Sequence, residues 1–586
     1  MGTGGRLSVK TGIRSILSII WGYKSRVVLG LACLLIADGG QLTVPLVVRG
    51  VVDGLAGGDA TGAWLARQAL ILFALALTVA SFRFAWRHFF FSMARQAELS
   101  LRNRILDHVM TLSTRYFSKT RTGEIMALAT NDVESVRQAI AMGFVAGFDA
   151  SGYALVAIGA MLWLDPVLAL WAILPLPLLS VIMAVSLRAI YNRWDAVQSS
   201  FEGLTEKTRE SMAGMRVLRA YGQEEGDAAD FEKSNFDYFT KYMRYVKVDA
   251  FFHPAILLLA GSSMAILLGV GGARVIDGRT SIGSFVAFAS YLGMLTWPMI
   301  AGGWMMSLIQ RASASMDRIN ALLTVTDVEE TPRADESFSK RAKGEIEVRD
   351  LTFSFPNQAA PALSNLSFSV PPGASLGIVG EIGSGKSTVA QLLCRIYDPP
   401  EGALFLDGSD LIQIPIAALR QNVAYVPQEP FLFSDTIAEN LRLSKAEATL
   451  EEMRAVCRVA ALDDEIMAFP QAYETLLGER GVTLSGGQKQ RLCLARALLK
   501  PAPVLILDDT LSAVDAEAER RILAGLRDAT SGRTHLVISH RVSAVRDLDA
   551  ILCLERGRAI QMGTHEELSR APGFYRQMVE LQEVET

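Results

Sequence analysis

The chain has 586 residues, of which 50% are hydrophobic and 20% are charged, and its formal net charge at pH 7 is −4. Single hydrophobic cores seldom grow beyond about 300 residues, so the length excludes a one-domain protein, and the lack of net positive charge argues against nucleic acid as a partner. The mean hydropathy of +0.27 is too high for a purely soluble chain, whereas the charged fraction is too high for a purely membranous one, so apolar and polar parts must occupy separate stretches.

The first 26 residues form a basic lead-in, with Arg and Lys but no acidic residue ahead of a long apolar stretch. Such a segment can be a secretory signal peptide. Here the apolar stretch lacks a clear cleavage site and is followed by further stretches of the same kind. We therefore expect an amphipathic segment at the cytoplasmic membrane surface, with a signal peptide as the alternative.

Apolar windows of membrane-spanning length recur through the first half of the chain. Each has about 20 residues, enough to cross ~30 Å of hydrocarbon. A buried soluble helix would explain one such window but not the series, so we predict an all-α transmembrane domain over residues 1–323 with about six spans. The windows are Val27–Val48, Trp64–Phe84, Phe144–Leu164, Pro166–Leu187, Ala250–Val270 and Ile282–Met306.

The connections between these windows alternate in length. Those after the first, third and fifth windows are short, whereas residues 87–142 and 189–248 are long, polar, helix-patterned and rich in Arg and Lys. Basic connections stay in the cytoplasm. We therefore expect a multi-pass protein of the cytoplasmic (inner) membrane, with both long connections and both termini in the cytoplasm and with helices that continue well beyond the bilayer.

Residues 324–343 are charged and poor in large apolar side chains, which predicts a linker. From residue 344 to the end at 586, short β-rich runs alternate with helical segments. This alternation is typical of an α/β domain with a largely parallel sheet. The β-rich runs are Ile346–Phe355, Leu366–Val370, Leu376–Val379, Val423–Val426, Val504–Leu507, His535–Ile538 and Ala550–Leu554.

The strongest chemical signal is the run GEIGSGKST at residues 380–388. It follows a predicted strand and opens a helix, which is the setting that a P-loop requires. Its glycines let backbone N–H groups turn toward phosphate oxygens, and the helix N-terminus adds partial positive charge. We expect Lys386 to reach the β- and γ-phosphates and the Ser387 hydroxyl to bind Mg²⁺. The candidate ATP-binding residues of this loop are Gly380, Gly383, Ser384, Gly385, Lys386, Ser387 and Thr388.

Two further motifs lie in the same half. Residues 504–508, VLILD, read as a buried strand that ends in a carboxylate, and with a P-loop upstream we expect Asp508 to take part in binding magnesium. A core strand capped by Asp is the alternative. The pentapeptide Leu484-Ser485-Gly486-Gly487-Gln488 precedes a predicted helix and offers a second anion-binding end. We expect it to serve a phosphate across a subunit interface rather than the one held by its own P-loop.

Together these motifs resemble those of the ATP-binding-cassette (ABC) superfamily, and the whole chain resembles a half-transporter of the ABC exporter type. The resemblance implies export of drug- or lipid-like amphiphiles by alternating access, with ATP and Mg²⁺ as cofactors and a second half-transporter as partner. It also implies roles for further residues. Phe355 would stack on adenine, Gln428 would contact Mg²⁺ and sense the membrane domain, Asp515 would lie in the D-loop between two ATP sites, and His540 would contact the γ-phosphate.

The same resemblance extends to segments that would link the two domains. Residues 114–123 and 211–222 resemble the coupling helices of the family, and residues 478–481 resemble the exporter loop that contacts the long cytoplasmic helices. Solvated helix turns are the alternative for the coupling segments. The candidate coupling residues are Tyr116, Phe117, Arg216 and Tyr221.

The chain departs from the family pattern directly after Asp508. The family usually has Glu there, which polarises the attacking water, whereas this chain has Asp509. Its carboxylate should stand back by about 1 Å, and a misplacement of that size can cost about 10²-fold in rate. We therefore expect ATP to bind and to be hydrolysed slowly, with Asp509, His540 and Gln428 as the candidate catalytic residues.

Residues 507–515, LDDTLSAVD, resemble one branch of heterodimeric bacterial exporters, whose two ATP sites are unequal. In that interpretation the partner subunit supplies the catalytic Glu of the strong site. The alternatives are a homodimeric exporter that works with Asp509, or an ATP-gated or regulatory membrane protein.

The substrate pathway is weakly specified by the sequence. Arg83, Arg87 and His88 lie near the inner end of the second window. Charges at such depths often mark a pathway, but snorkelling to the surface explains them equally well. The sixth window is rich in Met and Trp, which suits varied apolar ligands as well as ordinary helix packing.

Overall fold

The computed structural model describes the backbone of residues 4–58, 60–327, 342–355, 360–478, 481 and 484–584. The side chains of residues 4–11, 583–584 and parts of 176–191, 252–260 and 296–303 lie outside this description. The chain divides into two compact units, one formed by Met1–Leu112 with Phe117–Asp327 and the other by Ser113–Tyr116 with Val328–Thr586. Most of the predicted linker, residues 328–341, lies outside the described residues.

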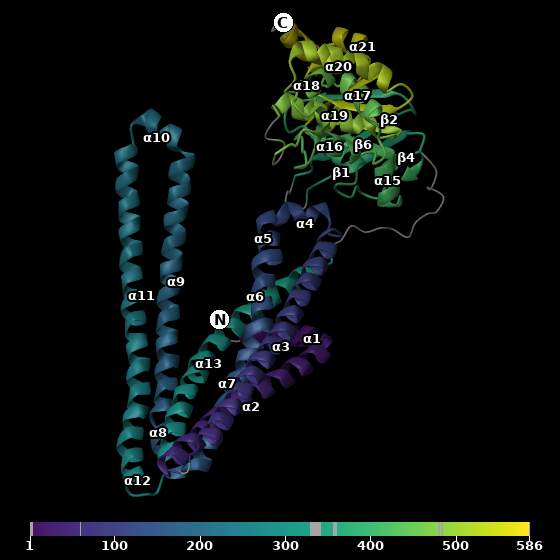
Figure 1. Cartoon of the computed structure of the whole chain (residues 1–586). Helices are drawn as coiled ribbons and strands as arrows, with labels where there is room; N and C mark the ends of the chain where they lie inside the picture. The colour runs from purple at the N-terminus through teal and green to yellow at the C-terminus, as the bar shows by residue number, and fades with distance from the viewer. Residues whose placement is uncertain are drawn as a thin grey trace. The chain divides into compact units, whose positions relative to one another are not determined.

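The described part of the first 327 residues is helical. Loops between the helices are short, and the longest helices are α3, α9, α11 and α13 (Figure 1). The elements are α1 (Gly4–Gly22), α2 (Lys24–Ala56), α3 (Gly62–Val109), α4 (Thr114–Lys119), α5 (Thr122–Ala127), η1 (Leu128–Asp132), α6 (Val133–Gln138), η2 (Ala139–Gly143), α7 (Phe144–Leu164), α8 (Pro166–Ile173), α9 (Pro175–Ala213), α10 (Met215–Tyr221), α11 (Glu224–Ile266), η3 (Leu267–Gly271), α12 (Gly272–Ile276) and α13 (Ile282–Leu323).

Among the described residues, four helical stretches are long and apolar enough to cross a membrane: Lys24–Ala56, Gly62–Val109, Thr122–Leu164 and Leu257–Ile276. They contain the predicted first, second and third windows and most of the fifth. The fourth and sixth windows fall on α8–α9 and α13, where part of the side chains lie outside the description. None of the most apolar window of α3 is buried inside the protein, as expected of a helix whose side chains meet lipid.

Several helices are longer than a bilayer needs. At 1.5 Å per residue, the 48 residues of α3 extend about 72 Å, more than twice the ~30 Å of hydrocarbon. Helices α9 and α11 run side by side and are joined by the short α10 (Figure 1). Aromatic pairs connect them, including Trp194 with Tyr245, whose ring centroids are 5.2 Å apart. Gly222 ends α10 with a left-handed φ of 62°.

Helix α13 is bonded to elements from the first half of this helical region. The hydroxyl of the buried Tyr291 donates to the carbonyl of Leu42 in α2 at 2.8 Å. Nearer its C-terminal end, Arg318 and Ser315 both donate to the buried Asp132 of η1, at 2.9 Å. These contacts fix α2, η1 and α13 against one another and position the polar groups between them.

The second unit contains two sheets. A six-stranded sheet has the order β10-β9-β3-β8-β7-β6, in which only the β10–β9 pair is antiparallel. A separate four-stranded antiparallel sheet has the order β2-β1-β4-β5. The strands are β1 (Ile346–Phe353), β2 (Leu363–Val370), β3 (Ser375–Gly380), β4 (Leu404–Leu406), β5 (Ser409–Asp410), β6 (Val423–Val426), β7 (Val504–Asp508), β8 (Thr534–Ile538), β9 (Ala550–Glu555) and β10 (Arg558–Gly563).

The first two strands do not join the parallel sheet that the sequence predicts for this domain. In β1 and β2 buried and accessible residues interchange along the strand, whereas all six residues of β3 are buried. Strands of an antiparallel sheet can leave one face in water, but strands of a parallel sheet are covered on both faces. The interchange of buried and accessible residues along Ile346–Phe353 therefore indicates that this strand belongs to the antiparallel sheet.

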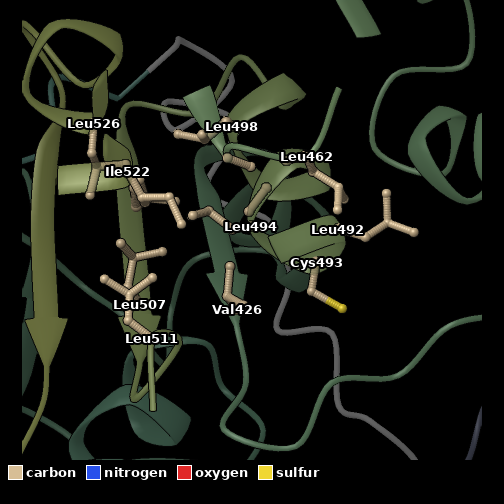
Figure 2. Packing of buried hydrophobic residues seen from close by; sticks show 14 of the residues in the cluster. Val426, Leu462, Leu492, Cys493, Leu494, Leu498, Leu507, Leu511, Ile522 and Leu526 are labelled. Atoms are coloured by element: carbon tan, nitrogen blue, oxygen red, sulfur yellow. The ribbon is translucent and has the colours of Figure 1, made fainter. Parts of the chain in front are cut away.

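Helices cover the parallel sheet and bury its apolar side chains. Figure 2 shows Leu507 of β7 and Val426 of β6 in one cluster with Leu494 of α19 and Ile522 of α20, all of them buried. The helices of this unit are α14 (Lys386–Leu393), α15 (Ile416–Asn422), α16 (Ile437–Arg442), α17 (Leu450–Val459), α18 (Asp463–Met467), η5 (Ala472–Glu474), α19 (Gly486–Leu499), α20 (Ala516–Ala529), η7 (Val542–Ala544), α21 (His565–Arg570) and α22 (Phe574–Val584).

Candidate functional site

The loop between β3 and α14 passes close to neighbouring backbone at two glycines. Gly380 has a φ of 157°, and a Cβ there would lie 2.2 Å from the carbonyl oxygen of Leu554. Gly385 has a φ of 97°, and a Cβ there would lie 2.8 Å from the carbonyl oxygen of Ala362. No L side chain fits either position without displacing the chain. These two glycines therefore fix the tight turn that carries the loop from the strand into the helix.

Lys386 lies at the centre of this loop. Its Nζ donates to the carbonyl oxygens of Gly380 at 2.9 Å and of Glu381 at 2.7 Å. Burial lowers the pKa of the Lys386 ammonium, while the nearby carboxylates Asp509 and Asp508 oppose that shift. A partly desolvated cation enclosed by a loop of this shape is suited to binding phosphate oxygens.

Asp508 and Ser387 meet at the carboxyl edge of the parallel sheet. Asp508 ends β7 and is 1% exposed, and its Oδ1 accepts a hydrogen bond from the Ser387 hydroxyl at 2.9 Å. Burial raises the pKa of Asp508, and donors from Ser387 and Tyr425 act in the opposite direction. A hydroxyl beside a carboxylate is the oxygen-donor combination that Mg²⁺ prefers. The sequence analysis missed Tyr425 of β6, whose hydroxyl lies 3.4 Å from Asp508 Oδ2.

The next residue, Asp509, is held in an unusual backbone conformation. Its φ is 48°, in the left-handed region, and its N–H donates to the carbonyl of Ile538 at 2.8 Å. Its Oδ1 lies 2.9 Å from Nδ1 of His540, which follows the neighbouring strand β8. The structure therefore brings together the predicted catalytic residues Asp509 and His540.

Two further predicted residues, Gln428 and Phe355, are placed by their neighbours. Val426 of β6 pairs with Leu507, so Gln428, exposed two residues later, lies at the same sheet edge as Asp508. Phe355 is half-buried, and its ring centroid lies 5.2 Å from that of Tyr397 in an edge-on contact. The sequence analysis did not select Tyr397, which fixes one side of the Phe355 ring. Ser384 and Thr388 are buried beneath the loop.

The pentapeptide Leu484–Gln488, called the signature from here on, lies at the start of α19. Ser485 caps this helix in a capping box, because its hydroxyl accepts from the N–H of Gln488 and the Gln488 side chain accepts from the N–H of Ser485. A Cβ at Gly487 would lie 2.7 Å from the carbonyl oxygen of Ala513. The side chain of Gln490, not selected from the sequence, bonds to Ser512 and Ala513. The signature is thus tied to the D-loop.

The remaining predicted residues lie farther along the chain or in other elements. Asp515 caps α20 by accepting from the N–H of Ala518 at 2.8 Å, and this backbone contact holds the pKa of Asp515 below its usual value. Tyr116 and Phe117 lie in α4, and the exposed Arg216 and Tyr221 lie in α10. In the predicted loop 478–481, residues 479 and 480 lie outside the described residues.

Two family models match the chain. The model of the ABC transporter transmembrane region matches residues 27–299, and the model described as ABC transporter matches residues 363–512. The two matches fall on the helical region and on the α/β unit. Together with the similar solved structure described below, they confirm the predicted fold class, a helical transmembrane domain followed by an α/β nucleotide-binding domain.

Curated relatives align over most of the chain. The chain is 35% identical to the probable multidrug resistance ABC transporter ATP-binding/permease protein YheI of Bacillus subtilis, over 97% of each chain. It is 36% identical to the multidrug resistance-like ATP-binding protein MdlA of Escherichia coli, over 93% of this chain and 92% of the relative. It is 33% identical to the ATP-dependent lipid A-core flippase of Thiobacillus denitrificans, over 89% of each.

One solved structure is similar across nearly the whole chain. It is that of a bacterial Atm1-family ABC exporter with ATP bound, with a TM-score of 0.77 and 27% sequence identity. The similarity covers 95% of this chain and 99% of the exporter.

Proposed function

Because the chain belongs to the ABC transporter family, in which an ATPase is coupled to membrane transport, we propose that it is one half of an exporter that moves amphiphilic substrates. One observation carries the nucleotide part of this proposal. Lys386 Nζ lies inside the glycine loop, and the Ser387–Asp508 hydrogen bond stands beside it at the same sheet edge. This arrangement places a cation for phosphate and oxygen ligands for a metal within one site.

Within this site, ATP would lie with its phosphates on residues 380–388 and its adenine against Phe355. Ser387, Asp508 and Gln428 would supply oxygen ligands to Mg²⁺. Among the described residues, no group of three or more His, Cys, Asp or Glu side chains could hold a metal by itself. That suits Mg²⁺, which is usually held by one or two protein ligands together with phosphate oxygens and water, and which there neutralises charge on the phosphates.

Turnover at this site would be slow. The Asp509 carboxylate is directly hydrogen-bonded to His540, and its side chain is one methylene shorter than that of Glu. Asp509 would need to release His540 and still reach an attacking water. His540 would contact the γ-phosphate in the closed state. We propose that rapid hydrolysis occurs at a second site, where the signature Leu484–Gln488 of this chain faces the P-loop of a partner that supplies Glu.

The arrangement of the signature supports such a partner. Within the described part of the chain, no hydrogen bond or ion pair joins residues 484–488 to the P-loop, and their hydrogen bonds run to Gly481, to Glu465 and to residues of α19. A signature that serves another subunit requires a head-to-tail dimer. We propose a heterodimer, in which Tyr116, Phe117, Arg216 and Tyr221 would couple cassette closure to the membrane helices.

The relatives support a proposal for the substrate class and the membrane. Those above are named as multidrug resistance transporters and as a flippase of lipid A-core, and both kinds of cargo are amphiphiles. We propose export across the cytoplasmic membrane, with the α/β unit and both termini in the cytoplasm, because the long connections of the helical region are basic.

The test of the nucleotide site is Lys386→Ala in the full-length transporter. Loss of the loop cation should abolish ATP binding and ATP-driven dye transport in vesicles, because the phosphates then lack their main counter-charge. Lys445→Ala serves as the control, since Lys445 forms a surface ion pair with Glu452 in the same unit. Unchanged ATP affinity in Lys386→Ala would remove the basis of the proposal.

The proposed heterodimer is tested by purifying the tagged full-length chain and identifying the subunit that copurifies with it. We expect a second half-transporter to copurify with the tagged chain and to have Glu directly after the aspartate that corresponds to Asp508. The pair should hydrolyse ATP faster than this chain alone. If the chain purifies as a homodimer that hydrolyses ATP rapidly, the heterodimer is wrong and the chain is a homodimeric exporter.

A further inference from the structure

The loop that follows β8 carries His540 and is bonded to other elements on two sides. On one side, the guanidinium of Arg541 donates to the carbonyl oxygen of Ser512, at the start of the D-loop, at 3.0 Å. It also forms an ion pair with the buried Glu519 of α20, and the hydroxyl of Ser543 donates to the same carboxylate. The loop is therefore joined to the first turn of α20 and to the D-loop that precedes it.

On the other side, Gln582 of the C-terminal helix α22 bonds twice to the main chain of the loop. Its Nε2 donates to the carbonyl oxygen of His540 at 2.7 Å, and its Oε1 accepts from the N–H of Val542 at 2.8 Å. Val542 begins the 3₁₀ turn η7, and the first N–H groups of a helical turn find no acceptor within the turn itself. One side-chain amide thus holds the backbone on both sides of Arg541.

The core of the α/β unit determines where this amide lies. Tyr575 of α22 is fully buried, and Met578 and Val579 pack against the cluster that contains Leu507 of β7. Residues 575, 578, 579 and 582 lie three or four positions apart and therefore share one face of the helix. Gln582 continues the face that packs on the unit, so the position of its amide follows from the packing of α22.

A fixed loop matters because His540 has to be placed against a phosphate. The exposed imidazole is held by Nδ1, which lies 2.9 Å from Oδ1 of Asp509. A group that is already in position acts without first being ordered, and a misplacement of 1 Å can cost about 10²-fold in rate. The two bonds from Gln582 restrain the main chain of His540 itself, which is where such a misplacement would begin.

We propose that Gln582 is a positioning residue for ATP hydrolysis, which holds the loop of His540 for the contact of this histidine with the γ-phosphate. Gln582 acts through the backbone of the loop, so its role requires no contact with the nucleotide. The C-terminal helix thereby supports the hydrolytic site, although it lies outside residues 363–512, which the ABC transporter model matches. That the loop serves hydrolysis rests on the function proposed above; the hold on the loop does not require ATP.

The hold on the loop is tested by Gln582→Met in the full-length chain in lipid nanodiscs, because Met keeps the length of the side chain and loses both hydrogen bonds. Without nucleotide, we expect hydrogen–deuterium exchange at Val542 to become about tenfold faster, since this N–H loses its acceptor. Exchange in the strands of the unit should not change. Gln582→Glu retains an acceptor for Val542, and its exchange there should remain slower than in Gln582→Met.

The effect on hydrolysis is measured on the same variants. Single-turnover hydrolysis by Gln582→Met should be about tenfold slower, whereas its affinity for ATP should not change, because β3 and α14 carry the phosphate-binding loop. A contact that only stabilises the fold would not separate rate from affinity in this way. Gln577→Met, which changes an exposed glutamine of the same helix, should match the unmodified chain in exchange, rate and affinity.

Three results would overturn the proposal: unaltered exchange at Val542 in Gln582→Met, faster exchange there without slower hydrolysis, or faster exchange throughout the unit. The outcome is separable from that of the proposed function. Failure of Gln582→Met to slow hydrolysis would leave the dependence of ATP binding on Lys386 untouched. Conversely, unchanged ATP affinity in Lys386→Ala would not alter the exchange measured at Val542 without nucleotide.

Discussion

At residue scale, Asp509, the residue directly after Asp508, is held by contacts to strand β8 and the residues that follow it. Asp509 adopts a left-handed φ of 48°, and its carboxylate bonds to Nδ1 of His540 at 2.9 Å. The backbone N–H is fixed by the carbonyl of Ile538, so the carboxylate extends from a fixed main-chain position. A longer carboxylate from the same backbone position would reach farther into the space beside the P-loop.

We therefore predict that Asp509→Glu increases ATP hydrolysis by this chain by about 10-fold to 10²-fold, because the carboxylate then reaches the attacking water. Single-turnover hydrolysis by the purified full-length chain measures the effect. Asp464→Glu, which lengthens an exposed aspartate at the start of α18, should change nothing. An unaltered rate in Asp509→Glu would show that the length of this side chain is not what limits turnover.

At the scale of elements, β3 carries the P-loop and is anchored at its start as well as at its end. Asp549, directly before β9, accepts from the N–H of Ser375 at 2.8 Å and from its hydroxyl at 2.7 Å. These hydrogen bonds, from the hydroxyl first and then the backbone, hold the pKa of Asp549 below its usual value. Strands β3 and β9 are thus joined where both begin.

Asp549→Asn should lower the free energy of unfolding by about 1 kcal/mol, a modest loss because the carboxylate is partly exposed. Since its pKa is lower in the folded chain, the carboxylate contributes fully above about pH 4 and less as the pH falls through the folded pKa. Thermal unfolding midpoints measured from neutral to acid pH test this pH dependence. The difference in midpoint between Asp549→Asn and the unmodified protein should shrink in acid.

Asp547→Asn is the matched control, since Asp547 forms exposed ion pairs with Arg527 and Arg546. It should shift the midpoint little at any pH. A constant difference between Asp549→Asn and the unmodified protein across the pH range would contradict the assigned role of the carboxylate.

At the scale of the whole molecule, the signature has two tasks that can be separated. Ser485 stabilises α19 as the residue of a capping box, and in the proposed dimer it also faces a partner's nucleotide. Thr449 forms the same capping box with Glu452 at the start of α17. The chain therefore contains a second cap of the same kind that takes no part in the proposed site.

Ser485→Ala and Thr449→Ala should each cost about 1 kcal/mol of stability through loss of the cap. Only Ser485→Ala should lower ATP hydrolysis by the assembled transporter, because only that hydroxyl would contact phosphate across the interface. Unfolding midpoints and steady-state ATP hydrolysis of the dimer, measured on both variants, separate the tasks. Equal rates in the two variants would mean that the signature serves only as a helix cap.

Elements with strong local signals could be predicted from the sequence. The strand Val423–Val426 has the predicted bounds, and the P-loop lies between a strand and a helix as its motif requires. Residues whose roles depend on distant partners were not found. Tyr397 and Tyr425 look like ordinary aromatic residues until Phe355 and Asp508 lie against them.

The sequence by itself determined the two-part organisation, the apolar helices and the family, because hydropathy, strand and helix periods and glycine-rich motifs are local properties of the chain. Only the tertiary structure decided that β1 and β2 leave the parallel sheet, and that Arg318 and Ser315 of α13 meet Asp132 of η1. Both arrangements depend on the packing of segments far apart in sequence, which no local pattern encodes.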